Sequence, residues 1–326
     1  MLNIVKYRKL LELDQRHYRH QPFSLNYPVD SDLETALDSL CDAVVEGVRD
    51  GVVIVVLSDR DVSPDTLPIH AALATGAVHQ RLIREGLRCD CNIIVETGTA
   101  RDAHQFAVLL GVGATAVYPF LAFQIINDLH ARGALKGDLL QHRKFFRRGI
   151  RKGLLKVLSK MGISCVSSYR GAQLFETVGL GEEVTSRCFP GAAGQVGGLG
   201  FAEIDREVRE MAKVAWQNAA PLAQGGLLKY AYGGEFHAYN PDVVTLLQQA
   251  VQSGRKADYQ VFADRVNQRA PAALRDLLRV TSDRESVPLD DVEPVESIFP
   301  RFDSAGTVSY THLTLPTMST SCRWGG

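Results

Sequence analysis

The chain has 326 residues, of which 45% are hydrophobic and 22% charged, and 36 basic against 37 acidic side chains give a net charge of −1. This globular composition excludes wholesale disorder, and the balanced charge excludes a global field that would draw the chain to nucleic acid or anionic lipid. No stretch reaches the ~18 consecutive apolar residues that a membrane helix needs, and the charged N-terminal stretch lacks the apolar region of a signal peptide. We therefore expect a cytoplasmic protein that binds neither a membrane nor nucleic acid.

Six cysteines are scattered along the chain, and no CxxC pair occurs among them. This usage fits a reducing compartment better than a disulfide framework. Neither a structural zinc nor an iron–sulfur cluster held by this chain alone is expected.

The first 30 residues are polar and aromatic and are expected to lead into the first helix. Ser31 and Glu34 have the spacing of a capping box, in which each side chain bonds a free N–H group at the start of a helix. Apolar residues then recur every three or four positions until Gly51, which predicts an amphipathic helix ended by a glycine cap. These apolar positions are Leu33, Leu37, Leu40, Val44 and Val48.

Short apolar runs then alternate with helical segments. The predicted strands are Val52–Leu57, Asn92–Val95, Ala114–Val117 and Ser164–Ser167. The predicted helices between and around them cover about 68–85, 102–110, 120–130 and 149–161. This alternation is typical of an α/β domain with a parallel sheet.

The C-terminal part is expected to be mainly helical after a glycine-rich loop at 182–200. Helices are predicted at about 201–216, 256–267 and 272–280, and another begins near Pro241. From about Thr307 the chain becomes rich in threonine and serine, loses all periodicity and looks foreign to the rest. We expect residues 307–326 to be a disordered tail.

Polar residues gather where the predicted strands end, which is where ligands bind in parallel sheets and barrels. Asp59–Arg60 and Glu96–Arg101 could equally be structural ion pairs, and no nucleophile stands at readable spacing from a base. The strand ends nevertheless supply the ligand-site candidates: Ser58, Asp59, Arg60, Glu96, Thr97, Arg101, Tyr169 and Arg170.

Three other motifs carry weaker signals. Gly111-x-Gly113-x-x-Ala116 follows a helix and precedes a strand, the reverse of the order that dinucleotide binding needs. The glycines of 194–200 precede a helix, but no lysine follows in P-loop spacing. The basic, aromatic run Arg143–Lys156 suits nucleic acid, although a solvated or interface helix face is the preferred interpretation.

Longer strings resemble a known family, the glutamate synthase large subunit, from about Tyr18 to Gly306. The strings are YRHQ (18–21), VLSDRDVSPDTLPIHAALATGAVHQRLIREGLRCD (56–90), NIIVETGTARDAHQFAVLLGVGATAVYPFLA (92–122), KGLLKVLSKMGISCVSSYRGAQLFETVGL (152–180) and QGGLLKYAYGGEFHAYNPDVV (224–244).

The resemblance implies an α/β fold in which a degenerate, barrel-like parallel β/α domain is followed by a mainly helical lead-in segment. Residues 1–222 would be the central domain of the family, incomplete at its N-terminus, and 223–306 the truncated start of the FMN-binding domain. Residues 307–326 would be an unrelated, artefactual tail.

The family converts glutamine and 2-oxoglutarate to two glutamates, by hydrolysing glutamine in one domain and sending ammonia through a tunnel to an FMN site. Its nucleophile, flavin site and iron–sulfur cysteines match nothing here. The resemblance therefore implies an inactive connecting domain near the tunnel, with no catalytic residue and no FMN or iron–sulfur cluster in this fragment. Its partners would be the glutaminase, FMN and β-helix domains of the same subunit, together with an electron-donating small subunit where a pyridine nucleotide is the donor. The alternative is a self-contained module that binds a 2-oxo acid over the strand ends.

Overall fold

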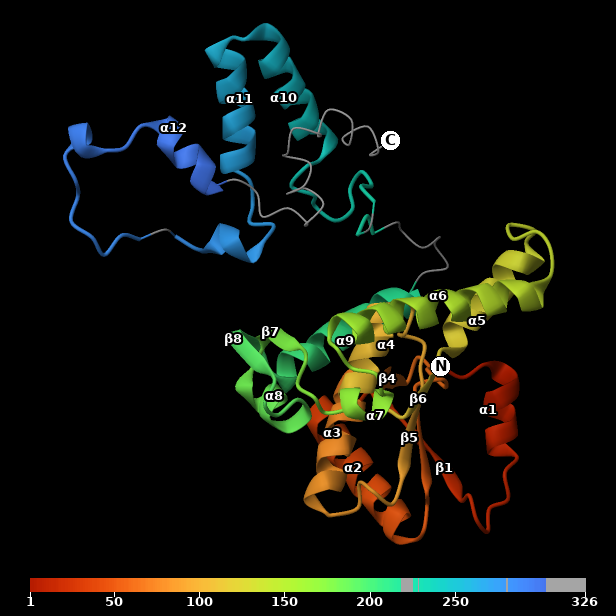
Figure 1. The fold of residues 1–326 in the computed structure, drawn as a ribbon. Coiled ribbons are helices and arrows are strands. Elements are labelled where there is room, and N and C mark those ends of the chain that lie inside the picture. Colours follow the sequence, from red (N-terminus) through yellow and green to blue (C-terminus); the bar gives the residue numbers. More distant parts are fainter. Residues whose placement is uncertain (218–224, 228, 280, 303–326) are drawn as a thin grey trace. The chain divides into compact units, whose positions relative to one another are not determined.

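The computed structural model describes residues 1–217, 225–227, 229–279 and 281–302, and the predicted tail 307–326 lies outside these ranges. The chain divides into two compact units, Met1–Ala220 and Pro221–Gly326. The elements of the first unit, drawn in Figure 1, are α1 (Ile4–Leu11), β1 (His20–Ser24), β2 (Asn26–Pro28), α2 (Leu33–Arg49), β3 (Ile54–Ser58), β4 (Thr66–Pro68), α3 (Ala71–Arg84), β5 (Asn92–Glu96), α4 (Ala103–Gly111), β6 (Ala116–Tyr118), α5 (Phe120–Ala131), α6 (Leu139–Lys160), α7 (Val166–Tyr169), β7 (Glu176–Leu180), α8 (Glu182–Cys188), β8 (Ala193–Leu199) and α9 (Phe201–Gln217).

A four-stranded parallel sheet in the order β1-β3-β5-β6 organises this unit. The order follows the chain, so every crossover advances in the same direction, and right-handed crossovers then place α2, α3 and α4 on one face. Figure 1 shows α2 and α3 on one side of the strands and α1 on the other. The predicted α/β class with parallel pairing is confirmed.

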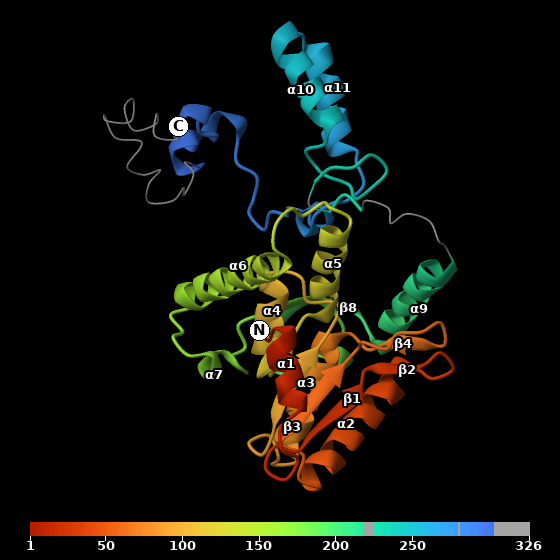
Figure 2. The same cartoon turned by 90° about the vertical axis from the view of Figure 1, so that its right-hand side faces the viewer.

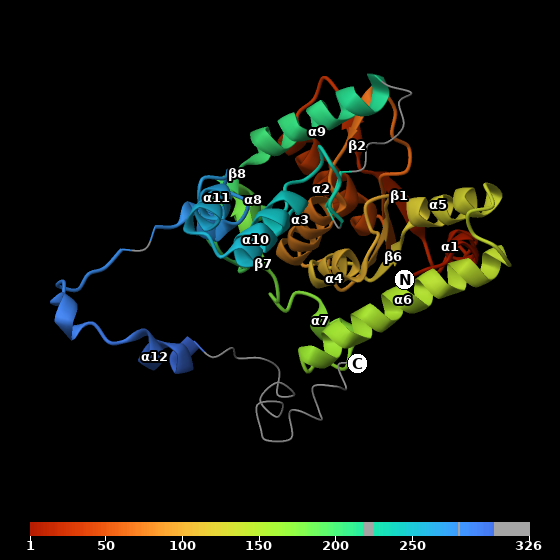
Figure 3. The ribbon, with the colours of Figure 1, turned by 90° about the horizontal axis from the view of Figure 1, so that it is seen from above.

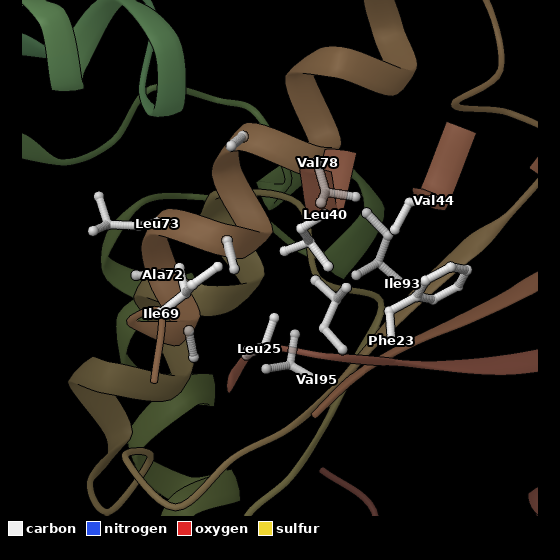
Figure 4. Close-up of a cluster of buried hydrophobic side chains, with 14 of the residues drawn as sticks. Phe23, Leu25, Leu40, Val44, Ile69, Ala72, Leu73, Val78, Ile93 and Val95 are labelled. Carbon is white, nitrogen blue, oxygen red and sulfur yellow. The ribbon is translucent and has the colours of Figure 1, made fainter. Parts of the chain in front are cut away.

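The main core lies between the sheet and these crossover helices. Alternate strand residues such as Val55, Leu57 and Ile93 point into it and are fully buried. Figure 4 shows side chains from the strands, among them Phe23 and Val95, packed with others from the helices. The predicted helical stripe that begins at Leu33 is buried here as well.

A smaller core covers the opposite face of the sheet. Val56 and Ile94 pack there against Tyr7 of α1, Tyr118 of β6 and Phe123 of α5. α1 lies over the strands on this side in Figure 2, and Figure 3 shows the long helix α6 beside α4 and α5. Because both faces of the sheet are covered, side chains on both sides of β3 are buried. This explains why its sequence is apolar at nearly every position.

The predicted strand at 164–167 is wrong. The segment forms the short helix α7 instead, and Val166 is exposed. A short apolar run without a neighbouring strand cannot be told from a helical turn by its pattern alone.

The glycine-rich stretch that was predicted to be a loop contains α8 and β8, and β8 pairs in parallel with β7. The glycines permit this pairing. A Cβ on Gly198 would lie 2.4 Å from the Gly179 carbonyl oxygen, and one on Gly194 would lie 2.4 Å from Thr177 Oγ1. These glycines allow the two strands to approach closely, whereas the sequence pattern alone indicates a loop.

The N-cap of α2 lies one residue after the cap that the sequence predicted. Asp32, not Ser31, is the N-cap of α2, and its Oδ1 accepts a 2.8 Å hydrogen bond from the Thr35 amide. The first 30 residues also hold α1, β1 and β2, which the sequence pattern did not predict.

The second unit is helical in its described part, with α10 (Pro241–Ser253) and α11 (Lys256–Asn267) packed together. Its remaining elements are short: η1 (Leu274–Leu277), η2 (Leu289–Asp291), α12 (Val295–Ile298) and η3 (Phe299–Phe302). In place of the helix predicted at 272–280, the described residues form only the short 3-10 helix η1, and residue 280 lies outside the described ranges. Within the described ranges, no helix combines the length and apolarity needed to cross a membrane.

Candidate functional site

The carboxyl ends of the four parallel strands form one row. Ser24, Ser58, Glu96 and Tyr118 end β1, β3, β5 and β6, and the strand register pairs each with the next. Parallel strands end at the same edge of a sheet, so the polar residues that follow them meet there. Ser58 and Glu96 are two of the sequence candidates in this row.

Glu96 is the centre of a hydrogen-bond cluster on this edge. Its Oε2 accepts bonds of 2.7 Å from Ser58 Oγ and 2.9 Å from Tyr7 Oη. Its Oε1 accepts a 2.8 Å bond from Arg60 Nε, and a second guanidinium nitrogen of Arg60 lies 2.6 Å away. The buried carboxylate is therefore paired with a cation and with two hydroxyl donors, as burial of a charge requires.

Aromatic rings surround the arginine of this pair. The guanidinium of Arg60 lies 4.4 Å from the ring centre of Phe120 and 5.9 Å from that of Tyr118. Tyr118 in turn stacks on Tyr7 with ring centres 4.3 Å apart. Burial and the neighbouring Glu96 carboxylate raise the pKa of Tyr7, so its hydroxyl stays a donor.

Asp59 and Thr97 form a separate, buried pair next to this cluster. Thr97 Oγ1 donates to Asp59 Oδ2, and the Gly98 amide donates to Asp59 Oδ1 at 2.8 Å. Burial raises the pKa of Asp59, and these two hydrogen bonds oppose the rise. The pair ties the end of β3 to the turn after β5.

The other three candidates lie elsewhere. Arg101 is exposed, and its amide donates to Gln105 Oε1 at the capped start of α4. Tyr169 and Arg170 belong to α7 and its C-cap, and Arg170 Nη1 donates to Thr115 Oγ1 at 3.1 Å. Thr115 precedes β6, so Arg170 lies at the opposite end of that strand. Neither of the two ion pairs considered as the alternative, Asp59–Arg60 and Glu96–Arg101, occurs among the described residues, because Arg60 pairs with Glu96.

A cavity of about 740 Å³ opens over the strand-end row. Of the sequence candidates, Ser58, Arg60 and Glu96 line it. Residues outside the strand-end candidates complete the wall, chiefly Tyr7, Arg8, Tyr118, Asn127 and Arg143, of which only Arg143 was singled out in the sequence, as the start of the basic run. Tyr118 could have been found, because it ends a predicted strand, whereas Tyr7 and Arg8 lie on a helix that was not predicted.

The wall of this cavity combines apolar side chains with arginine, glutamate and tyrosine groups. Arg143 Nε and Nη2 donate to Asn127 Oδ1 at 3.0 and 2.6 Å, and Arg143 has no carboxylate partner among the described residues. Among all the residues that the structure describes, no three His, Cys, Asp or Glu side chains lie close enough together to hold a metal ion. Arginine donors suit a carboxylate or phosphate ligand.

Comparison with known proteins agrees with the resemblance noted in the sequence. The model of the family "Glutamate synthase central domain" matches residues 1–181. A ferredoxin-dependent glutamate synthase 2 (chloroplastic) of Arabidopsis thaliana is 39% identical over 298 residues, covering 87% of this chain and 18% of the relative. The NADPH glutamate synthase large chain of Bacillus subtilis (strain 168) is 37% identical over 288 residues, covering 87% of this chain and 19% of the relative. The chain thus spans about a fifth of the length of these relatives. It belongs to the glutamate synthase central domain family.

Proposed function

We propose that this chain acts as the connecting central domain of a glutamate synthase, next to the ammonia tunnel, and that it is catalytically inactive alone. The parent enzyme would be an oxidoreductase of ammonia assimilation that forms two glutamates from glutamine and 2-oxoglutarate. The observation that carries the scaffold role is the pairing of the strand-end groups with one another. Glu96 binds Ser58, Tyr7 and Arg60, and Asp59 binds Thr97 and Gly98. Groups satisfied in this way stabilise a domain and leave little capacity for chemistry.

The barrel-like geometry is part of the same proposal. A sheet whose strands follow the chain order without reversal is what a portion of a β/α barrel would have, whereas doubly wound sheets reverse direction at a switch point. We also propose, from the resemblance alone, the domain limits 1–222 and 223–306 and the unrelated tail 307–326.

Cofactors, partners and location are proposed on the same basis. FMN and the iron–sulfur cluster would be held by other parts of the parent, which also supply the glutaminase, FMN and β-helix domains as partners. A small subunit would deliver electrons in pyridine-nucleotide enzymes. A cytoplasmic location is proposed, although several relatives carry "chloroplastic" in their names.

A chimera tests the connecting role. Residues 18–306 replace the matching segment of the Bacillus subtilis large chain, and glutamine hydrolysis is compared with glutamate formation. We expect the two rates to stay coupled, with little free ammonia. A chimera that performs both half-reactions while releasing ammonia would overturn the proposal. In parallel, the isolated chain is expected to show neither glutamate formation nor a stoichiometric flavin absorption band.

A second candidate is binding of a 2-oxo acid over the strand ends. It is favoured by the 740 Å³ cavity, whose wall includes Arg8 and Arg143. Calorimetry with 2-oxoglutarate, glutamine and glutamate separates the two candidates. Saturable binding of 2-oxoglutarate that is lost in Arg143→Gln would favour the binding module, and failure of all three ligands would favour the scaffold.

A further inference from the structure

A second cavity, of about 590 Å³, lies in the first unit away from the strand-end row. α3, α4, α8 and β7 contribute its walls, and most of its lining is apolar, including Val108, Leu174, Phe175 and Phe189. Its size falls within the range of about 300–1,000 Å³ that small-molecule pockets occupy. Nothing in the proposed scaffold role requires this space.

Two histidines line this mainly apolar wall, His79 of α3 and His104 of α4. The His104 ring packs edge to face against Phe175, with ring centres 5.9 Å apart, whereas His79 is the one hydrogen-bonded to an arginine. His79 of α3 lines the cavity and is only 8% exposed. Its Nδ1 accepts a 2.7 Å hydrogen bond from Arg88 Nε. Since an arginine can only donate, Nδ1 carries the lone pair and the single proton of the neutral ring is on Nε2.

The Nε2 edge has no hydrogen-bond partner among the described residues. It lies toward Gly171, another residue of the cavity wall, where an added Cβ would be 3.9 Å from Nε2. Burial and the charges of Arg88 and Arg170 lower the pKa of His79 to about 4. At neutral pH the cavity therefore receives a fixed N–H donor from an uncharged ring.

Two arginines near His79, Arg88 and Arg170, form no ion pair with a carboxylate in the described part of the chain. Arg88 donates to the neutral His79 ring and to the carbonyl oxygens of Cys91 and Gly113, at 2.8 and 2.9 Å. Arg170 donates to the Thr115 hydroxyl. Glu176 also lines the cavity, but it is exposed, and the charges that act on His79 are those of the two arginines.

We propose that this cavity binds a small, mainly apolar monocarboxylate, whose carboxylate accepts a hydrogen bond from His79 Nε2. The Arg88 bond polarises the ring, so that the Nε2–H group becomes a stronger donor. A carboxylate on the far side of the imidazole offsets the positive field of Arg88 and Arg170. The aromatic walls of Phe175 and Phe189 then bury the apolar body of the ligand.

A backbone feature at the cavity wall agrees with a built site. Gln173 has φ of 53°, the one left-handed conformation of a non-glycine residue within the described ranges. Its side-chain amide donates to the Pro190 carbonyl oxygen at 3.4 Å, beside Gly191. Unfavourable backbone geometry of this kind is found often at ligand sites.

The test is an NMR titration of the whole chain with 3-phenylpropionate, observing the histidine ring signals. We expect saturable shifts of the His79 signals, and at least tenfold weaker binding of the neutral analogue 3-phenylpropanamide. His79→Phe removes the donor and should abolish binding, whereas His130→Phe, on α5 outside the cavity lining, should bind normally.

A variant that leaves His79 intact guards against a folding defect. Val178→Trp adds bulk at an exposed position of the cavity wall and should weaken binding at least tenfold. Equal affinity for the acid and the amide would overturn the carboxylate assignment. The absence of any saturable shift at His79 would overturn the site itself, and neither result would affect the scaffold role.

Discussion

Tyr7 Oη donates a 2.9 Å hydrogen bond to Glu96 Oε2, and the two residues lie 89 positions apart in the chain. The bond fixes α1 across one face of the sheet, where the Tyr7 ring also stacks on Tyr118. A helix that the sequence pattern did not predict thus completes the polar cluster at the strand ends.

Removing this hydroxyl should destabilise the first unit. Tyr7→Phe keeps the ring in its stack but removes one donor to the buried Glu96 carboxylate, at an expected cost of about 1.5–3 kcal/mol for a bond to a charged group. Urea denaturation would measure the loss in the free energy of unfolding. Tyr18→Phe, at a residue that is 54% exposed, is the control and should change little. Equal effects of the two variants would contradict the cluster.

Two glycines of α6 should respond to alanine in opposite ways. A Cβ at Gly149 meets nothing within 4 Å, so Gly149→Ala should stabilise by about 0.5–1 kcal/mol through helix propensity. A Cβ at Gly153 would lie 2.4 Å from Ala103 Cβ of α4, so Gly153→Ala should destabilise by about 1–3 kcal/mol. Thermal unfolding of both variants checks the packing of α6 on α4. The prediction fails if Gly153→Ala is the more stable of the two.

Alanine substitutions at Ser31 and Asp32 test which of the two residues caps α2. Asp32→Ala removes the acceptor of the Thr35 amide and should lower the unfolding midpoint, because that amide loses its partner. Ser31→Ala should leave the midpoint unchanged. The reverse ranking would restore the capping box expected from the sequence.

His79 should make stability depend on pH. Its pKa is lowered from 6.5 to about 4 in the folded chain, so between these values the unfolded chain binds a proton that the native chain does not. The contribution of His79 to the free energy of unfolding is therefore at its full value above pH 6.5. As pH falls from 6.5 toward about 4, it should decrease by on the order of 2 kcal/mol after allowance for solvent screening.

Denaturant unfolding at neutral pH and near the lower value would measure this loss. His79→Gln cannot take up the proton and should lose less stability on acidification, whereas His130→Gln should behave as the parent chain does. An unchanged pH dependence in His79→Gln would show that another group is responsible.

The buried elements of the first unit were predictable because they carry strong patterns. The run at Val52–Leu57 and the stripe from Leu33 to Val48 describe β3 and α2 closely. The strand at 164–167 failed, because only pairing with a neighbour distinguishes a strand from a turn of helix there. β8 was missed since its glycines serve a close backbone approach, which depends on a partner that the local sequence does not reveal.

The candidate site was predictable only in part. Strand ends pointed to Ser58, Arg60 and Glu96, which meet, and to Asp59 and Thr97, which form their own pair. Arg170 was misplaced together with its strand. The second cavity left no sequence signal, because His79 belongs to an ordinary helical pattern and Arg88 lies in the turn that follows α3. The two side chains meet only when that turn folds back.

The strand-end row has a consequence for how the sheet can assemble. Successive residues of a strand point to opposite faces, so a slip of one position would turn Glu96 away from Arg60 and Tyr7 and into the apolar layer beneath α2 and α3. An unpaired carboxylate there would be far costlier than any misplaced valine. The paired carboxylate at the strand end therefore favours one alignment of apolar strands that could otherwise pair in neighbouring registers.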